Sequence, residues 1–136
     1  MSKTKVLVVD DDIAASRLLA IGLEKTGSFQ VVVENVGTRA ASTAREFRPA
    51  VILLDVCMPG VDGGDVAFRI HSDPTLRSTQ IIFLTSLVSG QEATAQSVLR
   101  GGYEFLAKPA SITKVVECID RHVPRVSETA TNASLA

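Results

Sequence analysis

The sequence predicts an α/β fold in which five parallel strands form a doubly wound sheet with helices on both faces. Two observations carry this prediction. Short apolar runs alternate along the chain with segments of helical spacing, and the runs are continuous, as in strands buried on both faces. Strict alternation with right-handed crossovers gives such a sheet. The 136 residues and 14.4 kDa suffice for one domain with a real core.

The expected strands are the five apolar runs. They are residues 6–9, 31–33, 51–54 and 81–84, with a weaker fifth at 105–107. Helical spacing between them predicts helices that end near Gly27, before Pro49 and near Asp73, followed by a fourth at about 91–100. The fifth helix is the most regular, because apolar residues from Ile112 to Val123 follow the i, i+3, i+4, i+7 stripe.

Composition excludes several classes of function. A net charge of −1 argues against nucleic-acid binding driven by a basic face. No apolar run approaches the roughly 20 residues that span a membrane, and the first residues do not form a secretory signal. Cys57 and Cys118 are too few for a disulfide framework or a multi-cysteine zinc site. We therefore expect a reduced, cytoplasmic domain over 1–123, followed by a polar flexible tail or linker over 124–136.

The functional site of a doubly wound sheet lies beyond the carboxyl ends of its strands. Polar residues follow four of the five predicted strands at this edge. They are Asp10, Asp11 and Asp12 after the first, Asp55 after the third, Thr85 and Ser86 after the fourth, and Lys108 with Pro109 after the fifth. These side chains are expected to meet on one rim of the sheet.

Three neighbouring carboxylates repel one another unless a cation lies among them. Oxygen ligands of this kind suit Mg²⁺, which Asp10 and Asp11 would hold from one side and Asp55 from the other. The same ion would neutralise charge on a phosphoryl group, so that the Asp55 carboxylate can attack it as a nucleophile and form an acyl phosphate. Thr85 would supply a hydroxyl donor and Lys108 a positive charge to the phosphoryl oxygens.

Several other polar residues have simpler expected roles. Asp12 is expected to cap the first helix, and Asp62, which precedes two glycines, to cap the third. Cys57 is interpreted as a small apolar residue rather than a reactive thiol. His71 and His122 lie on helices away from the rim, and we expect surface or packing roles for both.

Four motifs together resemble the receiver domain of two-component response regulators. They are "KVLVVDDD", "VILLDVCMPGVDG", "IIFLTS" and "FLAKP", and the resemblance runs from about Lys3 to His122. It implies a flavodoxin-like fold with strand order 2-1-3-4-5. It also implies a phospho-accepting signalling domain, which catalyses only its own phosphotransfer and slow autodephosphorylation.

The resemblance assigns roles at the acidic end of the rim. Asp55 matches the residue that takes a phosphoryl group from the phosphohistidine of a sensor histidine kinase or phosphotransfer protein. Asp10 and Asp11 match the acid pair that binds Mg²⁺, for which Mn²⁺ is a substitute. The backbone carbonyl of Cys57 matches a further metal ligand.

The remaining motif positions match the family's switch. Thr85 and Lys108 correspond to the hydroxyl and lysine that contact the phosphoryl group, and the backbone of Ser86 to a further contact. Phe105 occupies the aromatic switch position, and the bond before Pro109 matches a cis peptide. In the family this switch reshapes the face of the fourth helix, fifth strand and fifth helix, to which a downstream protein or a covalently linked output domain responds. An activation-linked homodimer through that face is a family expectation.

Three departures from the family pattern affect these expectations. The segment from Thr85 to Lys108 is about one residue longer than in common receivers. Tyr103 is expected to be exposed in an unusual turn. Cys57 and Leu87 occupy the two positions beside the phosphoryl group, and neither readily orients water, so we expect slow loss of phosphate.

Three other functions compete with this one, and the residues of the rim argue against each. In a haloacid-dehalogenase-like phosphohydrolase, Asp10 would be the nucleophile and Asp12 the general acid–base, but Asp55 would have no role and no late acidic pair follows Lys108. A flavin-binding flavodoxin would place a phosphate where three aspartates repel it. A degenerate receiver would not need the intact rim. A single-domain regulator and the N-terminal receiver of a longer one both remain open.

Overall fold

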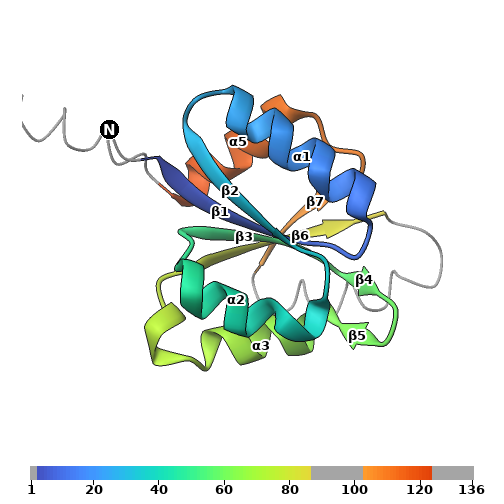
Figure 1. Cartoon of the computed structure of the whole chain (residues 1–136), viewed down its shortest axis with the longest axis vertical. Helices are drawn as coiled ribbons and strands as arrows, with labels where there is room; N and C mark the ends of the chain where they lie inside the picture. The colour runs from blue at the N-terminus through green and yellow to red at the C-terminus, as the bar shows by residue number, and fades with distance from the viewer. Residues whose placement is uncertain (1–2, 87–102, 124–136) are drawn as a thin grey trace, which may run out of the picture.

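A five-stranded parallel sheet forms the centre of the structure, and helices cover both of its faces (Figure 1). The computed structural model describes residues 3–86 and 103–123. The strands are β1 (Thr4–Val9), β2 (Phe29–Glu34), β3 (Val51–Asp55), β6 (Gln80–Thr85) and β7 (Glu104–Ala107). Their spatial order is β2-β1-β3-β6-β7, and all four pairings are parallel. This is the predicted order 2-1-3-4-5, so the doubly wound, flavodoxin-like fold is confirmed.

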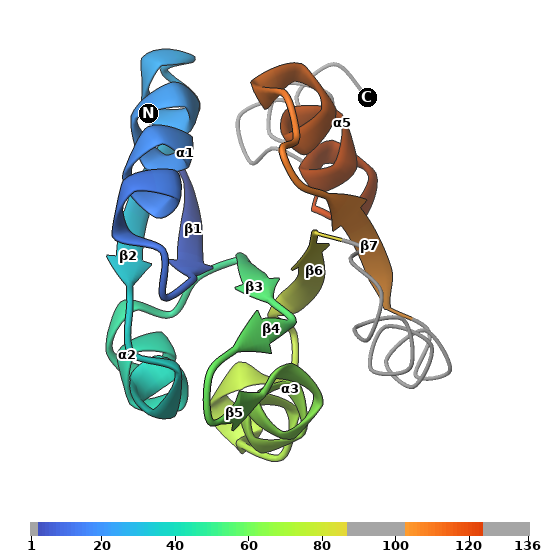
Figure 2. The ribbon, with the colours of Figure 1, turned by 90° about the vertical axis from the view of Figure 1, so that its right-hand side faces the viewer.

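Helices α1 and α5 lie on one face of the sheet, and α2 and α3 lie on the other (Figure 2). Their bounds are Ile13–Lys25 for α1, Ala40–Phe47 for α2, Gly63–His71 for α3 and Ile112–His122 for α5. Short 3₁₀ turns cover Gly37–Arg39 and Pro74–Leu76. The predicted fourth helix at about 91–100 and the predicted tail at 124–136 lie outside the described residues. No helix within 3–86 and 103–123 is both long and apolar enough to cross a membrane.

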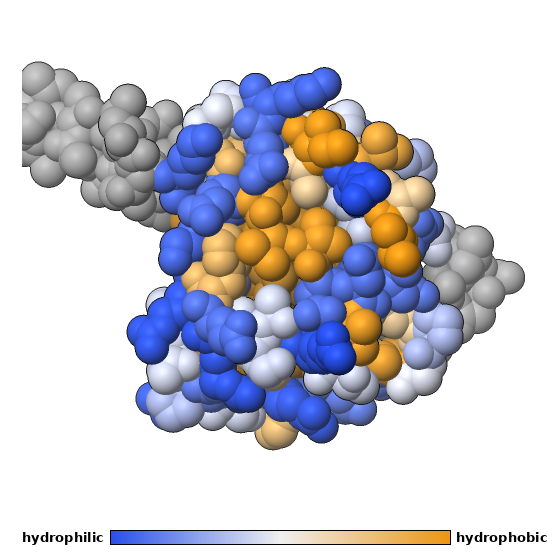
Figure 3. Space-filling view, in the orientation of Figure 1, coloured by the Kyte–Doolittle hydropathy of each residue, from blue (hydrophilic) through white to orange (hydrophobic). Residues whose placement is uncertain are grey.

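Two apolar layers hold the helices against the sheet. Leu7, Ile52 and Phe83 face α2 and α3, whereas the alternate residues of the same strands face α1 and α5. The central strands β1, β3 and β6 are almost fully buried, as continuous apolar runs predict. The edge strands β2 and β7 are mostly half-buried, because each has a neighbour on one side only. Figure 3 shows apolar surface along the β2 edge, between α1 and α2.

The helix ends follow local side-chain chemistry. The Asp12 carboxylate accepts a hydrogen bond from the N–H of Ala15 and so begins α1, and Asp62 caps α3 through the N–H of Gly64. Both caps were predicted. Helix α2 ends at Phe47, because the C-cap residue Arg48 adopts the left-handed conformation with φ of 53° directly before Pro49.

A small antiparallel hairpin follows β3 and was not predicted. It consists of β4 (Cys57–Met58) and β5 (Val61–Asp62), which pair on either side of a turn at Gly60. Gly60 has a φ of +72°, a conformation that glycine adopts without steric cost. The hairpin leads from the end of β3 into α3 and fixes the loop beside Asp55.

Candidate functional site

Four parallel strands end in polar residues at one edge of the sheet. Asp10 follows β1, Asp55 ends β3, Thr85 ends β6 and Lys108 follows β7. The register of the strand pairs continues to the carboxyl ends of the strands, where Asp55 lies opposite Leu84 and Thr85 lies opposite Ala107. A groove at this edge is lined in part by Asp10, Asp11, Asp55, Ser86 and Lys108. The polar residues that follow these strands therefore lie together on one rim of the sheet, as predicted.

Lys108 joins the two buried carboxylates of this rim. Its Nζ lies 2.7 Å from Oδ2 of Asp10 and 3.5 Å from Oδ2 of Asp55. Asp10 is 1% exposed and Asp55 5% exposed, so water screens their charges poorly. Burial alone would lower the pKa of Lys108. The hydrogen bond to Asp10 and the negative charges of both aspartates outweigh it and raise that pKa.

Two further hydrogen bonds hold Asp10, and a third holds the side chain that donates one of them. Its Oδ1 accepts from the N–H of Asp12 at 2.9 Å, and its backbone carbonyl accepts from Nδ2 of Asn35 at 2.7 Å. The same Asn35 nitrogen donates to Oγ of Ser16, which is buried on α1, at 2.9 Å. Asn35 and Ser16 were not predicted to contact the rim, because a single asparagine after a strand and a serine within a helix carry no local signal of this contact.

The Asp55 carboxylate combines a fixed orientation with a perturbed charge. Its Oδ1 accepts a hydrogen bond from the N–H of Cys57 at 3.1 Å, a contact that the hairpin after β3 makes available. Desolvation by burial, assisted by the charge of Asp10, raises the pKa of Asp55 to about 6. The N–H of Cys57 and the charge of Lys108 oppose this rise. Asp55 is thus a buried carboxylate that is still mainly ionised at neutral pH.

Asp10, Asp11 and Asp55 form a donor set that fits a hard divalent cation. One carboxylate oxygen from each lies within 4.8 Å of the others. Asp10 and Asp55 are buried, and the exposed Asp11 stands on the open side of the group. Three carboxylates against the one charge of Lys108 leave a negative excess that a dication would neutralise. All-oxygen ligands and an open side suit Mg²⁺, which keeps part of its water shell.

The two residues predicted to form the switch, Thr85 and Phe105, lie on β6 and β7. Thr85 is buried, and its carbonyl accepts a hydrogen bond from the N–H of Lys108 at 2.7 Å. The Lys108–Pro109 peptide bond is cis. Phe105 is half-buried and stacks on Phe83, its partner across the β6–β7 pair, with ring centroids 5.4 Å apart. The two switch positions are therefore linked through adjacent strands.

The prediction that Tyr103 is exposed is wrong. Tyr103 is half-buried, and its hydroxyl lies 2.6 Å from Nδ1 of His71 on α3. Its ring packs edge to face with Phe83, with centroids 5.2 Å apart, and burial raises its pKa. Tyr103 lies against His71 of α3 and packs on the core, so its ring is not directed into solvent. His71 has the packing role that was expected of it.

Comparison with known proteins agrees with this geometry. Residues 6–120 match the family model described as the response regulator receiver domain. The chain is 37% identical over 105 residues to the response regulator PleD of Caulobacter vibrioides, covering 77% of this chain and 23% of PleD. It is 36% identical over 129 residues to the transcriptional regulatory protein ResD of Bacillus subtilis, covering 94% of this chain and 51% of ResD.

Solved structures give the same result for the fold. The chemotaxis protein CheY4 of Vibrio cholerae is similar with a TM-score of 0.77 and 26% identity, over 90% of this chain and all of that one. The receiver domain of a histidine kinase from Syntrophus aciditrophicus is similar with a TM-score of 0.77 and 27% identity, over 90% and 92% of the two chains. The haloacid-dehalogenase-like alternative has no support here. Sequence match, strand order and acidic rim lead to one assignment: the chain belongs to the response regulator receiver domain family.

Proposed function

We propose that Asp55 is the phosphoacceptor of this receiver and takes its phosphoryl group from a phosphohistidine of a sensor histidine kinase or phosphotransfer protein. The observation that carries the proposal is the setting of the Asp55 carboxylate. Its Oδ1 is held by the N–H of Cys57, and its Oδ2 lies 3.5 Å from Lys108. Two further carboxylates lie within 4.8 Å. These contacts support the assignment of a nucleophile, a cation-binding group and a phosphoryl-binding charge to this rim.

The transfer exchanges one bond to phosphorus for another. An oxygen of ionised Asp55 attacks the phosphorus atom, the P–O bond forms, and the P–N bond to the donor imidazole breaks. Lys108 contacts the incoming phosphoryl oxygens as a positive charge, together with the Thr85 hydroxyl and the backbone of Ser86. The N–H of Cys57 keeps the carboxylate oriented during attack.

Asp10, Asp11 and Asp55 would hold Mg²⁺, or Mn²⁺ in its place, and the backbone carbonyl of Cys57 is proposed as a fourth protein ligand. Bound there, the ion neutralises negative charge on the carboxylates and on the phosphoryl group. Asp12 is not proposed as a ligand. Its Oδ1 accepts the Ala15 N–H at the start of α1.

The proposed output is a rearrangement of β6, β7 and α5. Phosphorylation would draw the Thr85 hydroxyl toward the phosphoryl group and let Phe105 turn inward from its stacked position on Phe83. Phe105 fills space but has no hydroxyl, so a partner would read its position by packing alone. The face of the fourth helix, β7 and α5 is proposed as the binding surface for a downstream protein or for a second copy of the chain.

The curated relatives are much longer than this chain. It spans 23% of PleD, 51% of ResD and 32% of a Rhodospirillum rubrum protein named protein-glutamate methylesterase/protein-glutamine glutaminase 3, to which it is 34% identical over 122 residues. A receiver is a signalling domain, and the methylesterase activity in that name belongs to the relative. We propose a receiver over 1–123 with a tail or linker over 124–136, working in the cytoplasm on a separate target or a linked output domain.

The test is Mg²⁺-dependent phosphorylation by a small phosphodonor such as acetyl phosphate, followed by intact-protein mass spectrometry. The wild type should gain one phosphoryl group with Mg²⁺ and none with a chelator, and Asp55→Asn should gain none. Asp12→Asn is the matched control, because asparagine also caps helices and the change in charge is the same. It should be labelled like the wild type. Unchanged labelling of Asp55→Asn would overturn the proposal.

A further inference from the structure

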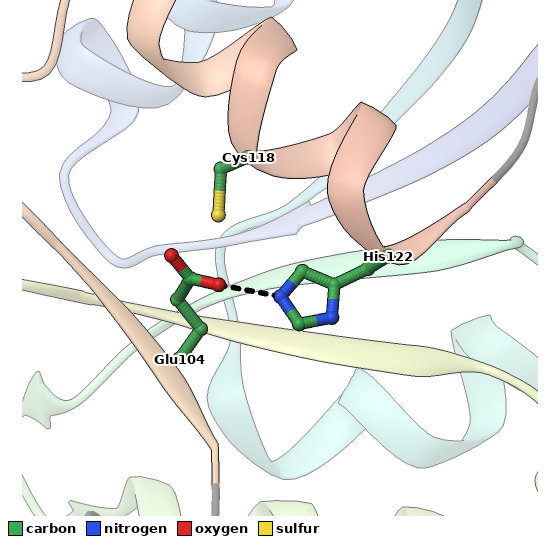
Figure 4. Close-up of side chains that lie close together, drawn as sticks. All are labelled: Glu104, Cys118 and His122. Atoms are coloured by element: carbon green, nitrogen blue, oxygen red, sulfur yellow. Dashed lines mark hydrogen bonds and ion pairs between the residues drawn. The ribbon is translucent and has the colours of Figure 1, made fainter.

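A second cluster of metal-ligating side chains lies at the opposite end of β7 from Lys108. Glu104 is the first residue of β7, and Cys118 and His122 lie one turn apart on α5. One ligand atom of each, a carboxylate oxygen, the sulfur and a ring nitrogen, lies within 4.8 Å of the other two. Figure 4 shows the three side chains pointing toward one another between strand and helix. None of them belongs to the acidic rim.

The spacing on α5 explains why two of the donors share one face. Residues i and i+4 of a helix lie one above the other, and this places Cys118 beneath His122. The third donor comes from the neighbouring strand, where Nε2 of His122 lies 2.6 Å from Oε1 of Glu104. No run of sequence signals this trio, because its members come from two elements that meet only after folding.

The chemistry of the three donors is that of a zinc site. Thiolate, imidazole and carboxylate are the protein ligands of Zn²⁺, at about 2.3 Å for sulfur and about 2.0–2.2 Å for nitrogen and oxygen. Tetrahedral geometry at those lengths separates the donor atoms by about 3.4–3.7 Å. The donor atoms lie at most 4.8 Å apart, and the shortest separation, between Glu104 and His122, is 2.6 Å, so each separation needs to change by at most about 1.4 Å. Three protein ligands leave the fourth position for water.

We propose that Glu104, Cys118 and His122 form a Zn²⁺ site that fastens β7 to the C-terminal end of α5. The site goes beyond phosphorylation at Asp55 and does not depend on it. It would lie on the face proposed to respond to phosphorylation, where a bound ion would restrict the movement of β7 against α5.

Arg121 supports this arrangement from outside the ligand group. Its guanidinium pairs with Oε2 of Glu104, whereas Oε1 faces His122. The carboxylate can thus present one oxygen to a metal while Arg121 holds the other, as groups around metal sites commonly orient a ligand. The C-terminus of α5 adds a favourable field for a cation, because unpaired carbonyls carry partial negative charge there.

Access and proton balance both permit binding. His122 and Glu104 are 29% and 30% exposed at their side chains, so an ion can reach them from solvent, while Cys118 forms the buried floor. Burial and the charge of Glu104 raise the pKa of Cys118 to about 11, so the thiol is protonated without a metal. Formation of the Zn–S bond releases that proton to water. His122 binds through Nε2 in its neutral form and gives up its contact with Glu104.

The experiment uses Co²⁺ as a spectroscopic substitute for Zn²⁺ on the full chain, with excess Mg²⁺ present to occupy the acidic rim. A thiolate ligand gives Co²⁺ a near-ultraviolet charge-transfer band. We expect one equivalent of Co²⁺ to produce this band and one equivalent of Zn²⁺ to abolish it. Zn²⁺ at 100 times its Kd should also raise the folding equilibrium constant about 100-fold, read as a higher thermal midpoint.

The chain offers a matched control for each of two ligands. Cys118→Ala should lose the band and His122→Gln should weaken Zn²⁺ binding by at least about 100-fold, since losing even an outer partner costs 10–100-fold. Cys57→Ala and His71→Gln remove the other cysteine and the other histidine and should leave band and affinity unchanged. His122 is partly exposed, so its variant tests the site even if Cys118→Ala folds poorly. No band in the wild type, or a band lost only in Cys57→Ala, would overturn the proposal.

Discussion

Replacing Asp11 by asparagine is expected to stabilise the protein when Mg²⁺ is absent. One carboxylate oxygen of each of Asp10, Asp11 and Asp55 lies within 4.8 Å of the other two, and the positive charge of Lys108 opposes their repulsion. Two like charges 4 Å apart repel by about 1 kcal/mol in water and by more in a less polar setting. Asp11 is exposed, so the value for water applies to each of its two pairs. Asp11→Asn should therefore raise the free energy of unfolding by about 1–2 kcal/mol.

Mg²⁺ should reverse this order. An ion that binds only the folded state stabilises it by RT ln(1 + [Mg²⁺]/Kd), which is about 2.7 kcal/mol at 100 times the Kd. The wild type should gain this stabilisation, whereas the variant, which lacks one of three carboxylates, should gain little. The sign of the stability difference between the two proteins thus depends on the cation.

Urea unfolding at neutral pH and low ionic strength, with chelator or with saturating Mg²⁺, measures both effects. Asp12→Asn is the control, since Asp12 is exposed, adjacent and equal in charge, and asparagine preserves its cap on α1. A gain in stability shared equally by both variants would mean that net charge is responsible. An Asp11→Asn protein no more stable than the wild type without Mg²⁺ would refute the reasoning.

Three further predictions concern the same rim. Burial and Asp10 raise the pKa of Asp55 to about 6, above its unfolded value of 3.8, so its contribution to stability is present below pH 3.8 and lost as the pH rises through 6. Urea unfolding without Mg²⁺ measures this as the difference in free energy of unfolding between the wild type and Asp55→Asn. That difference should fall by roughly 1–3 kcal/mol between pH 4 and 7. A difference that stays constant with pH would contradict the prediction. Lys108→Met should lower the free energy of unfolding of the Mg²⁺-free protein by roughly 2–4 kcal/mol, because two buried carboxylates lose the lysine that pairs with them. Lys114 is exposed, so Lys114→Met should leave the free energy of unfolding nearly unchanged in the same assay. Phosphate should leave Asp55 slowly, since half-buried Cys57 is a poor orienter of water, and a half-life of a few seconds in a phosphate-release assay would refute this expectation.

The sheet was predictable because its signal is local. Strands β1, β3 and β6 are continuous apolar runs between turn residues, and their burial on both faces gives that pattern directly. The edge strand β2 begins two residues before its predicted run, because Gln30 faces solvent there and interrupts the apolar pattern. The two-residue strands of the hairpin at 57–62 are too short to show any period.

The rim was predictable for a different reason. Parallel strands bring their carboxyl ends to one edge, so the topology alone places Asp10, Asp55 and Lys108 together. Contacts that do not follow from this strand topology could not be predicted from the sequence. The hydrogen bonds from Asn35 to Asp10 and between Tyr103 and His71 depend on the position of a residue outside the strands and helices relative to a neighbouring element. The spacing of residues along the sequence does not predict that position.

The most direct measurement is to identify the aspartate that carries the phosphoryl group. Borohydride reduces an aspartyl phosphate to homoserine, so reduction after phosphorylation with acetyl phosphate and Mg²⁺ marks the acceptor for peptide mass spectrometry. The account predicts homoserine at position 55, dependent on Mg²⁺ and absent from 10, 11 and 12. Homoserine at position 10, or at none of these positions after stoichiometric phosphorylation, would contradict it.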